Sequence, residues 1–120
     1  MLARGGEKFP KHARLRKRLE FLSLSRGGKK IHSPHFLIIT QPNERGEARL
    51  GLTVSSKVGN AVLRNRVKRL LRECFRKYRH QIAPNQDVLI IARNSAATLS
   101  WFEVEREVRD ILIANRGRRK

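Results

Sequence analysis

The sequence predicts a single domain of the α+β class, a sandwich of helices and a β-sheet. Segments whose apolar residues recur with a period near 3.6 alternate along the chain with segments whose pattern is typical of strands. The 120 residues are 39% hydrophobic, which is enough to bury a core without disulfides or a metal. Neither an internal repeat nor a linker divides the chain. We therefore expect one domain over residues 9–113, between a flexible basic tail at 1–8 and a basic tail at 114–120.

The first half of this domain is predicted to contain one helix and at least two strands. Leu15, Leu19 and Leu22 recur at helical spacing, so a helix is expected over about residues 12–24, before RGGKK ends it. HFLIITQ predicts a strand, a loop at PNERGE follows, and ARLGLTVSSK predicts a second strand. Alternation along this second strand turns three polar side chains to one face: Thr53, Ser55 and Lys57.

The second half is predicted to contain a helix, a strand and a last helix. Gly59 and Asn60 supply a turn and a helix N-cap, and an apolar stripe with a period near 3.6 follows. The stripe consists of Leu63, Val67, Leu70, Leu71, Cys74, Phe75 and Tyr78. VLIIAR is apolar on both faces, as expected of a strand that is covered on each side, and Ser100 and Glu103 form a capping box for the last helix. The inner face of that helix is expected to consist of Val104, Val108, Ile111 and Leu112.

Charge indicates the class of partner. The formal net charge is +18 and the isoelectric point is about 11.7, so the chain repels itself unless a polyanion is bound. Nucleic acid fits best and an anionic membrane comes second. The sequence argues against a membrane, because no apolar run approaches the roughly 18 residues that a spanning helix needs. The single cysteine, Cys74, excludes a disulfide within the chain and fits a reducing cytosol. Its pattern is that of a small buried apolar residue.

The helix after Asn60 carries like charges on one side. Opposite the apolar stripe lie Asn65, Arg69, Arg72, Arg76 and Arg79. Arg64 and Lys68 lie along one flank and Arg66 along the other, while Glu73 is the one acid of this stretch. A solvated face is the usual outcome for a run of charge, but ordinary exposed helices mix both signs. The one-sided stripe therefore favours contact with nucleic acid, whose phosphates and base edges suit guanidinium groups.

Two further features leave alternatives open. Phe21 lies off the leucine stripe, where it fits stacking on an unpaired base as well as packing against the sheet edge. Its neighbours extend the basic surface: Arg14, Arg16, Lys17 and Arg18. A stand-alone ribonuclease would use histidines as general acid and base, and four are present: His12, His32, His35 and His80. Their spacing matches no metal motif. The acids concentrate where the exposed face of the last helix is expected, at Glu103, Glu105, Glu107 and Asp110.

A family resemblance sharpens this interpretation. GLTVSSKVGNAVLRNRVKRLLRECFR closely resembles the signature segment of the bacterial ribonuclease P protein component. It contains the strand with alternating hydroxyls, the Lys-x-Gly-Asn-Ala turn and the Arg-Asn-Arg helix. FPKHARLRKRLEF, LIIAR and the closing amphipathic helix stand around it in the family's order. The resemblance covers residues 9–113, which is nearly the whole chain.

The resemblance implies an αβββαβα two-layer sandwich, in which a left-handed βαβ crossover joins two parallel strands through the basic helix. It also implies a bacterial, cytoplasmic protein subunit of a ribonucleoprotein endonuclease. Such a subunit binds the catalytic RNA and the 5′ leader of precursor tRNA and supports removal of the leader. The catalytic site and its Mg²⁺ would belong to the RNA and the substrate, so no catalytic or metal-binding residue is expected in the protein. Neither a membrane nor a protein partner is expected to be required.

The same resemblance implies two sets of contacts. Contacts with the catalytic RNA are expected at Arg64, Asn65, Arg66, Lys68, Arg69 and Arg72. Contacts with the leader are expected between the first helix and the exposed face of the sheet, at Phe21, Thr53, Ser55, Lys57, Ala92 and Arg93. Many relatives carry aromatic residues where this chain has Ser25 and Ile39, so reduced stacking on the leader is expected. The alternative is a basic ribosomal or structural RNA-binding protein without a substrate role.

Overall fold

The computed structural model describes residue 23 and residues 26–43, 46–82 and 85–117, with side chains described as far as residue 113. Nearly all of the predicted first helix lies outside the described residues, as do Phe21, Ser25 and the predicted tail at 1–8. Predictions that fall there stay predictions.

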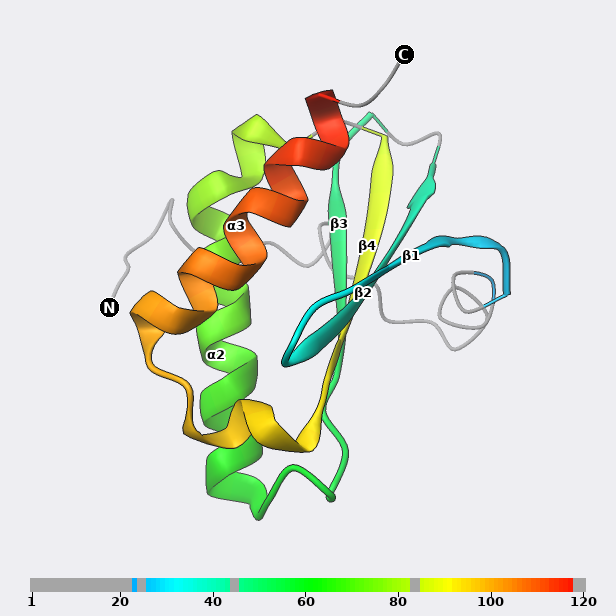
Figure 1. The fold of residues 1–120 in the computed structure, drawn as a ribbon. Helices are drawn as coiled ribbons and strands as arrows, with labels where there is room; N and C mark the ends of the chain where they lie inside the picture. The colour runs from blue at the N-terminus through cyan, green and yellow to red at the C-terminus, as the bar shows by residue number, and fades with distance from the viewer. Residues whose placement is uncertain (1–22, 24–25, 44–45, 83–84, 118–120) are drawn as a thin grey trace.

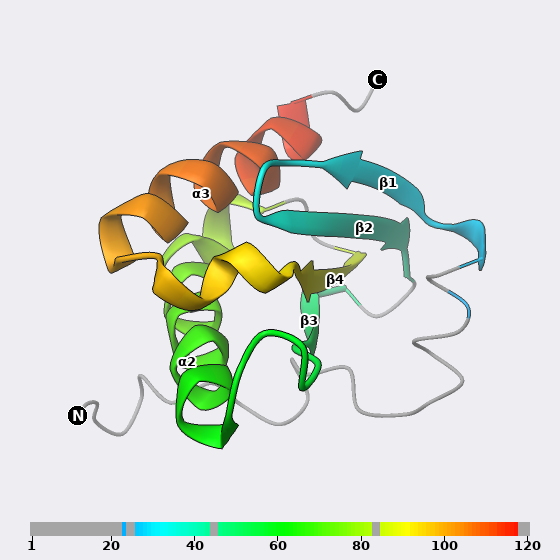
Figure 2. The ribbon, with the colours of Figure 1, turned by 60° about the horizontal axis from the view of Figure 1, so that its bottom comes forward.

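From residue 29 on, the described chain contains four strands, two α-helices and two short 3₁₀ helices; residues 23, 26 and 27, before them, are also helical. In chain order they are β1 (Lys29–His32), β2 (Phe36–Pro42), β3 (Arg49–Thr53), α2 (Ala61–Tyr78), η3 (Arg79–Gln81), β4 (Gln86–Ala92), η4 (Asn94–Thr98) and α3 (Trp101–Gly117). The strands form one sheet in the order β1-β2-β4-β3, and α2 and α3 lie on the same side of it (Figures 1 and 2). The two-layer α+β architecture is confirmed.

The pairing within the sheet is mixed. β1 pairs antiparallel with β2 and β2 with β4, whereas β3 runs parallel to β4. Parallel neighbours need a long crossover connection, and α2 supplies it between β3 and β4. β4 is paired on both sides and covered on both faces, as its apolar sequence predicts, because Val88, Leu89 and Ile90 are all buried. β1 is a strand that the residue pattern alone does not indicate.

The main core lies between the sheet and the two helices. Its largest fully buried side chains come from both layers: Phe36, Ile38, Ile90, Leu71, Phe75, Val104 and Leu112. Each contributes roughly 1.5–3 kcal/mol by leaving water, so this face fixes both helices on the sheet. Ile39 and Leu89 are buried on the opposite face of the sheet, with Leu37 and Ile91 packed against them.

The helix α2 begins and packs largely as predicted. The side chain of Asn60 caps it, because its Oδ1 accepts a hydrogen bond from the backbone N–H of Leu63 at 3.0 Å. Cys74 is buried in the core, and burial raises the pKa of its thiol to about 12, so it behaves as an apolar residue. Leu63 departs from the predicted stripe, since its side chain is 36% exposed. It lies in the first turn of the helix, against Gly59.

The helix α3 begins with the predicted capping box. The backbone N–H of Ser100 donates to Glu103 Oε1 at 2.8 Å, and the N–H of Glu103 donates to Ser100 Oγ at 3.2 Å. The acids of this helix were predicted to lie on its exposed face, but only Glu103 and Asp110 do so. Glu105 and Glu107 are partly buried and bind other elements, which corrects that expectation.

Candidate nucleic-acid interface

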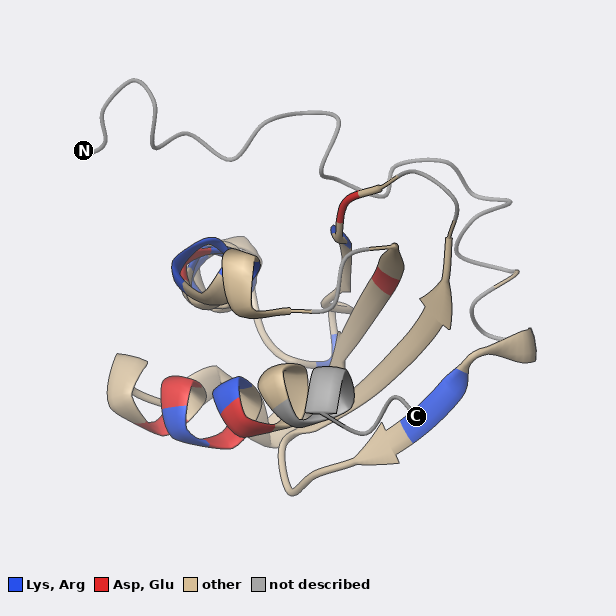
Figure 3. Ribbon diagram, turned by 90° about the horizontal axis from the view of Figure 1, so that it is seen from above, with Lys and Arg blue, Asp and Glu red and all other residues tan. Residues whose placement is uncertain are grey.

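The cations of α2 gather on the surface that faces away from the core. Between Ala61 and Tyr78 the helix carries seven Lys and Arg residues and one acid, Glu73. Figure 3 shows Lys and Arg on the turns of α2, whereas α3 carries acidic and basic residues together. The apolar stripe of α2 is fixed in the core, so its cations can only point outward or along the flanks.

The first half of α2 presents the open part of this surface. Asn65, Arg69 and Arg72 are exposed, and Arg64 and Lys68 are half-buried on the flank. Neither Lys68 nor Arg69 forms an ion pair with any acid in the described part of the chain. Positive charge that is not balanced within the protein is the feature that a polyanion binds.

Acids from other elements neutralise the second half of the same surface. Lys77 Nζ lies 2.8 Å from Glu105 Oε2 on α3, and Arg79 Nη2 lies 3.0 Å from Glu47 Oε1. Arg76 pairs at 2.7 Å with Glu73, its neighbour on the helix. Sequence reasoning treated the whole stretch as a single cationic face. The partners Glu47 and Glu105 lie 32 and 28 positions away in the chain, and no local pattern signals them.

Backbone carbonyls hold the two arginines of the Arg-Asn-Arg motif. Arg64 Nε donates to the carbonyl oxygen of Gly59 at 3.2 Å, in the turn before the helix. Arg66 Nη2 donates to the carbonyl of Leu99 at 2.7 Å, and its Nη1 donates to the carbonyl of Ala97 at 3.4 Å. Both guanidinium groups are therefore oriented by the protein itself. Asn65, between them, is exposed.

A second surface begins where β3 ends. Thr53 is exposed and lies in register with Ile91 of β4, on the face of the sheet away from the helices. The strand stops at Thr53, earlier than predicted, because Ser55 to Val58 form a turn: the N–H of Val58 donates to the carbonyl of Ser55 at 3.0 Å. Ser55 and Lys57 are both exposed on this turn, which leads directly into α2.

The predicted leader contacts at the end of β4 divide between the two faces of the sheet. Ala92 is 7% exposed, belongs to the main core and lies in register with Phe36, so its assignment to the exposed face is wrong. Alternation along β4 explains this, because Ile91 and Arg93 point to the opposite side from Ala92. Arg93 is exposed, and its guanidinium contacts the carbonyl of Ser33 at 3.3 Å and His32 Nδ1 at 3.0 Å.

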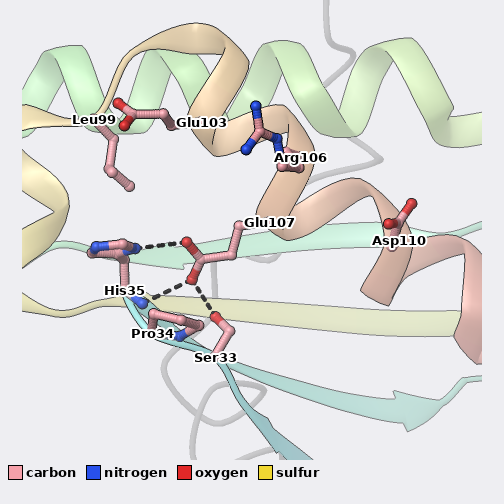
Figure 4. A pocket seen from close by; sticks show the side chains of 8 residues that line it. All are labelled: Ser33, Pro34, His35, Leu99, Glu103, Arg106, Glu107 and Asp110. Atoms are coloured by element: carbon pink, nitrogen blue, oxygen red, sulfur yellow. Dashed lines mark hydrogen bonds and ion pairs between the residues drawn. The ribbon is translucent and has the colours of Figure 1, made fainter.

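A cavity of about 490 Å³ lies between the β1–β2 turn and α3 (Figure 4). It is lined by Ser33, Pro34, His35, Leu99, Glu103, Arg106, Glu107 and Asp110. Glu107 Oε2 accepts hydrogen bonds from Ser33 Oγ at 2.5 Å and from the backbone N–H of His35 at 2.7 Å, and its Oε1 lies 2.7 Å from His35 Nδ1. Both carboxylate oxygens thus tie α3 to the turn. The lining of the cavity holds three carboxylates, Glu103, Glu107 and Asp110, which disfavour the binding of phosphate.

The described residues hold neither a metal centre nor a membrane span. No group of three or more His, Cys, Asp and Glu residues within them is placed to bind a metal ion. None of the helices in this part of the chain is long and apolar enough to cross a membrane. Among the described histidines, His35 is bound to Glu107 and His32 contacts Arg93.

Comparison with known proteins agrees with this geometry. The family model for ribonuclease P matches residues 9–115. The ribonuclease P protein component of Desulforapulum autotrophicum is 46% identical over 108 residues, covering 90% of this chain and 89% of that protein. That of Syntrophus aciditrophicus is 41% identical and covers 82% of each chain.

Solved structures show the same fold. The RNase P protein from Thermotoga maritima superposes with a TM-score of 0.78 at 30% identity, covering 84% of this chain and 96% of that one. The RNase P protein of Staphylococcus aureus superposes with a TM-score of 0.77 at 30% identity, covering 86% and 94%. Sequence, fold and the cationic helix agree, and the chain belongs to the family of ribonuclease P protein components.

Proposed function

We propose that the chain binds the catalytic RNA of ribonuclease P through the first half of α2 and contacts the 5′ leader of precursor tRNA where β3 and β4 end, on the face of the sheet opposite α2 and α3. The observation that carries the RNA contact is the uneven balance of charge along α2. Acids neutralise its last turns, while Lys68 and Arg69 form no ion pair within the described residues. Arg64, Asn65 and Arg72 extend the same contact, and Arg66 has a separate role that is argued below.

The geometry of the turn before α2 supports a joint role for the two surfaces. Thr53 ends β3, Ser55 and Lys57 follow on the turn, and Asn60 caps the helix. An RNA bound along α2 and a leader strand bound on the sheet would therefore meet near Lys57. We assign Thr53, Ser55, Lys57 and Arg93 to the leader, because exposed hydroxyls and cations suit a single-stranded backbone.

Stacking on leader bases depends on Phe21, which lies outside the described residues. Ile39, at a position where many relatives carry an aromatic residue, is 1% exposed and offers no stacking surface. We therefore expect leader affinity to come mostly from polar and cationic contacts, with a strong dependence on salt.

Cleavage itself is assigned to the RNA. We propose that the RNA and the phosphates of the substrate hold the Mg²⁺ ion that activates water, because phosphate oxygens are ligands that this ion prefers. The protein then contributes binding and orientation of the substrate. A bacterial cytoplasmic location agrees with the reduced, buried Cys74, and no protein partner is required in this scheme.

A reconstitution assay tests this function. Precursor tRNA is incubated at low Mg²⁺ with the full chain, with the catalytic RNA, or with both. We expect release of the 5′ leader from the mixture and none from the protein alone. Cleavage by the protein alone would favour a histidine ribonuclease. Co-sedimentation with ribosomal subunits, without stimulation of the catalytic RNA, would favour a ribosomal role.

A further inference from the structure

We propose that Arg66 is a positioning residue: it strengthens binding of the catalytic RNA by locking α2 to the η4–α3 connection, and it does not itself neutralise a phosphate. The proposal rests on the RNA interface proposed above. It gives Arg66 a different task from the RNA-binding residues Arg64 and Arg69, although the sequence presents all three as one run of charge.

The contacts of Arg66 are built into the protein. Its Nη2 lies 2.7 Å from the carbonyl oxygen of Leu99 and its Nη1 lies 3.4 Å from that of Ala97. The carbonyl of Ala97 lies in the last turn of η4, and that of Leu99 belongs to the C-cap residue that follows the helix. Carbonyls at the end of a helix lack partners within it, and a cation there is favoured by charge as well as by hydrogen bonding. The guanidinium of Arg66 supplies both the positive charge and the hydrogen-bond donors.

The two carbonyls lie directly before α3, so their contact with Arg66 also connects α2 to the beginning of α3. Leu99 is buried in the core and directly precedes Ser100, where the capping box of α3 begins. The guanidinium of Arg66 therefore joins α2, the end of η4 and the beginning of α3. The apolar stripe of α2 decides which side of the helix faces the sheet. The directional hydrogen bonds of Arg66 restrict the rotation about the helix axis that this packing still allows.

The rotation of α2 decides where its RNA-binding side chains point. Asn65 precedes Arg66 and Arg69 follows it by one turn, so both move with any rotation about the helix axis. A fixed rotation presents them to the RNA without a cost of ordering the helix at the moment of binding. Arg69 thus makes the electrostatic contact with the RNA, and Arg66, on the same helix, fixes the orientation of that helix.

The variants Arg66→Ala, Arg66→Lys and Arg69→Ala distinguish a positioning role from a phosphate contact. Lysine keeps the positive charge but lacks the planar fork that reaches two carbonyls at once. A direct phosphate contact therefore predicts that Arg66→Lys binds nearly as well as the native chain. A positioning role predicts that Arg66→Lys loses as much affinity for the catalytic RNA as Arg66→Ala. Arg69→Ala, on the exposed face one turn away, is the matched variant for a true phosphate contact.

The experiment measures the affinity of each full-length variant for the catalytic RNA over a range of salt, at a temperature where circular dichroism shows each to be folded. We expect both Arg66 variants to bind about tenfold more weakly with the native slope of log affinity against log salt. Arg69→Ala should reduce the slope by about 0.7 to 0.9. Hydrogen exchange adds a direct probe: the amide of Val104, bonded to the Ser100 carbonyl in the first turn of α3, should exchange faster in both Arg66 variants.

The outcomes separate the two proposals. Near-native binding by Arg66→Lys together with a reduced slope for Arg66→Ala would overturn the positioning role and make Arg66 a phosphate contact. Native affinity in both folded Arg66 variants would also overturn it, because a merely structural residue lowers stability without changing the affinity of folded protein. An unchanged slope in Arg69→Ala would instead count against the proposed interface itself. If Arg66→Ala does not fold, the affinity of Arg66→Lys for the catalytic RNA alone distinguishes the positioning role from a phosphate contact.

Discussion

The buried ion pair between β3 and β4 gives a sharp test of how the sheet is held together. Arg49 and Asp87 lie in register on the parallel pair, and their side chains are 8% and 10% exposed. Arg49 Nε donates to Asp87 Oδ1 at 2.9 Å and its Nη2 donates to Oδ2 at 2.8 Å. Asn43 Nδ2 adds a third donor, 2.6 Å from Oδ1.

Substitution of Arg49 by methionine keeps most of the side-chain volume and removes both of the hydrogen bonds that Arg49 donates to this carboxylate. Loss of one partner of a buried pair costs about 3–5 kcal/mol, because the other charge stays buried. The amide of Asn43 remains, so we expect the lower end, about 3 kcal/mol. For a domain of this size that loss lowers the melting temperature by about 10–20 °C.

Thermal and urea unfolding of Arg49→Met, followed by circular dichroism, measure this loss. The control is the double variant Arg49→Met with Asp87→Leu, which removes both charges and should recover most of the stability, because buried pairs are often matched by apolar residues. A single variant within about 1 kcal/mol of the native chain would refute the reasoning. So would a double variant as unstable as the single one.

The remaining expectations concern single side chains. Burial raises the pKa of Glu107, but hydrogen bonds from Ser33 and His35 outweigh it and hold the pKa below its ordinary value of 4.5. The ionised carboxylate therefore stabilises the fold above that pH, and the gain is lost as the pH falls through the folded pKa; Glu107→Gln should show a shallower fall of melting temperature between pH 6 and 3. Asn60→Ala removes the cap of α2 and should cost about 1 kcal/mol in urea unfolding, a cost that Asn60→Ser should spare. Phe21→Ala should weaken binding of precursor tRNA more than of leaderless tRNA if Phe21 stacks on the leader, and equal losses would contradict stacking.

Local pattern sufficed where a residue's environment follows from its neighbours in the chain. The period of α2 predicts Val67, Leu71 and Phe75 in the core, and Ser100 with Glu103 predicts the beginning of α3, because helix geometry and capping are set within one or two turns. The same reasoning misplaced Leu63, the first residue of the stripe, whose side chain is 36% exposed in the first turn of α2.

Contacts between distant segments could not be predicted in this way. The pairing of Lys77 with Glu105 and of Arg66 with Leu99 depends on how α3 packs across α2, which no pattern within α2 contains. Ala92 is a different case, since alternation along VLIIAR already places it on the opposite face from Arg93. It was assigned to the leader only by position in the family motif, and the strand period was the signal that could have corrected it.

The neutralised end of α2 has a consequence for the encounter between protein and RNA. Glu47 and Glu105 cancel cations near the last turn, while the first turns keep theirs and also carry the positive end of the helix dipole. Positive potential therefore rises from one end of the helix to the other. A polyanion that approaches along this gradient experiences a torque as well as an attraction. The protein can turn its Arg-Asn-Arg end toward the RNA before the two surfaces touch.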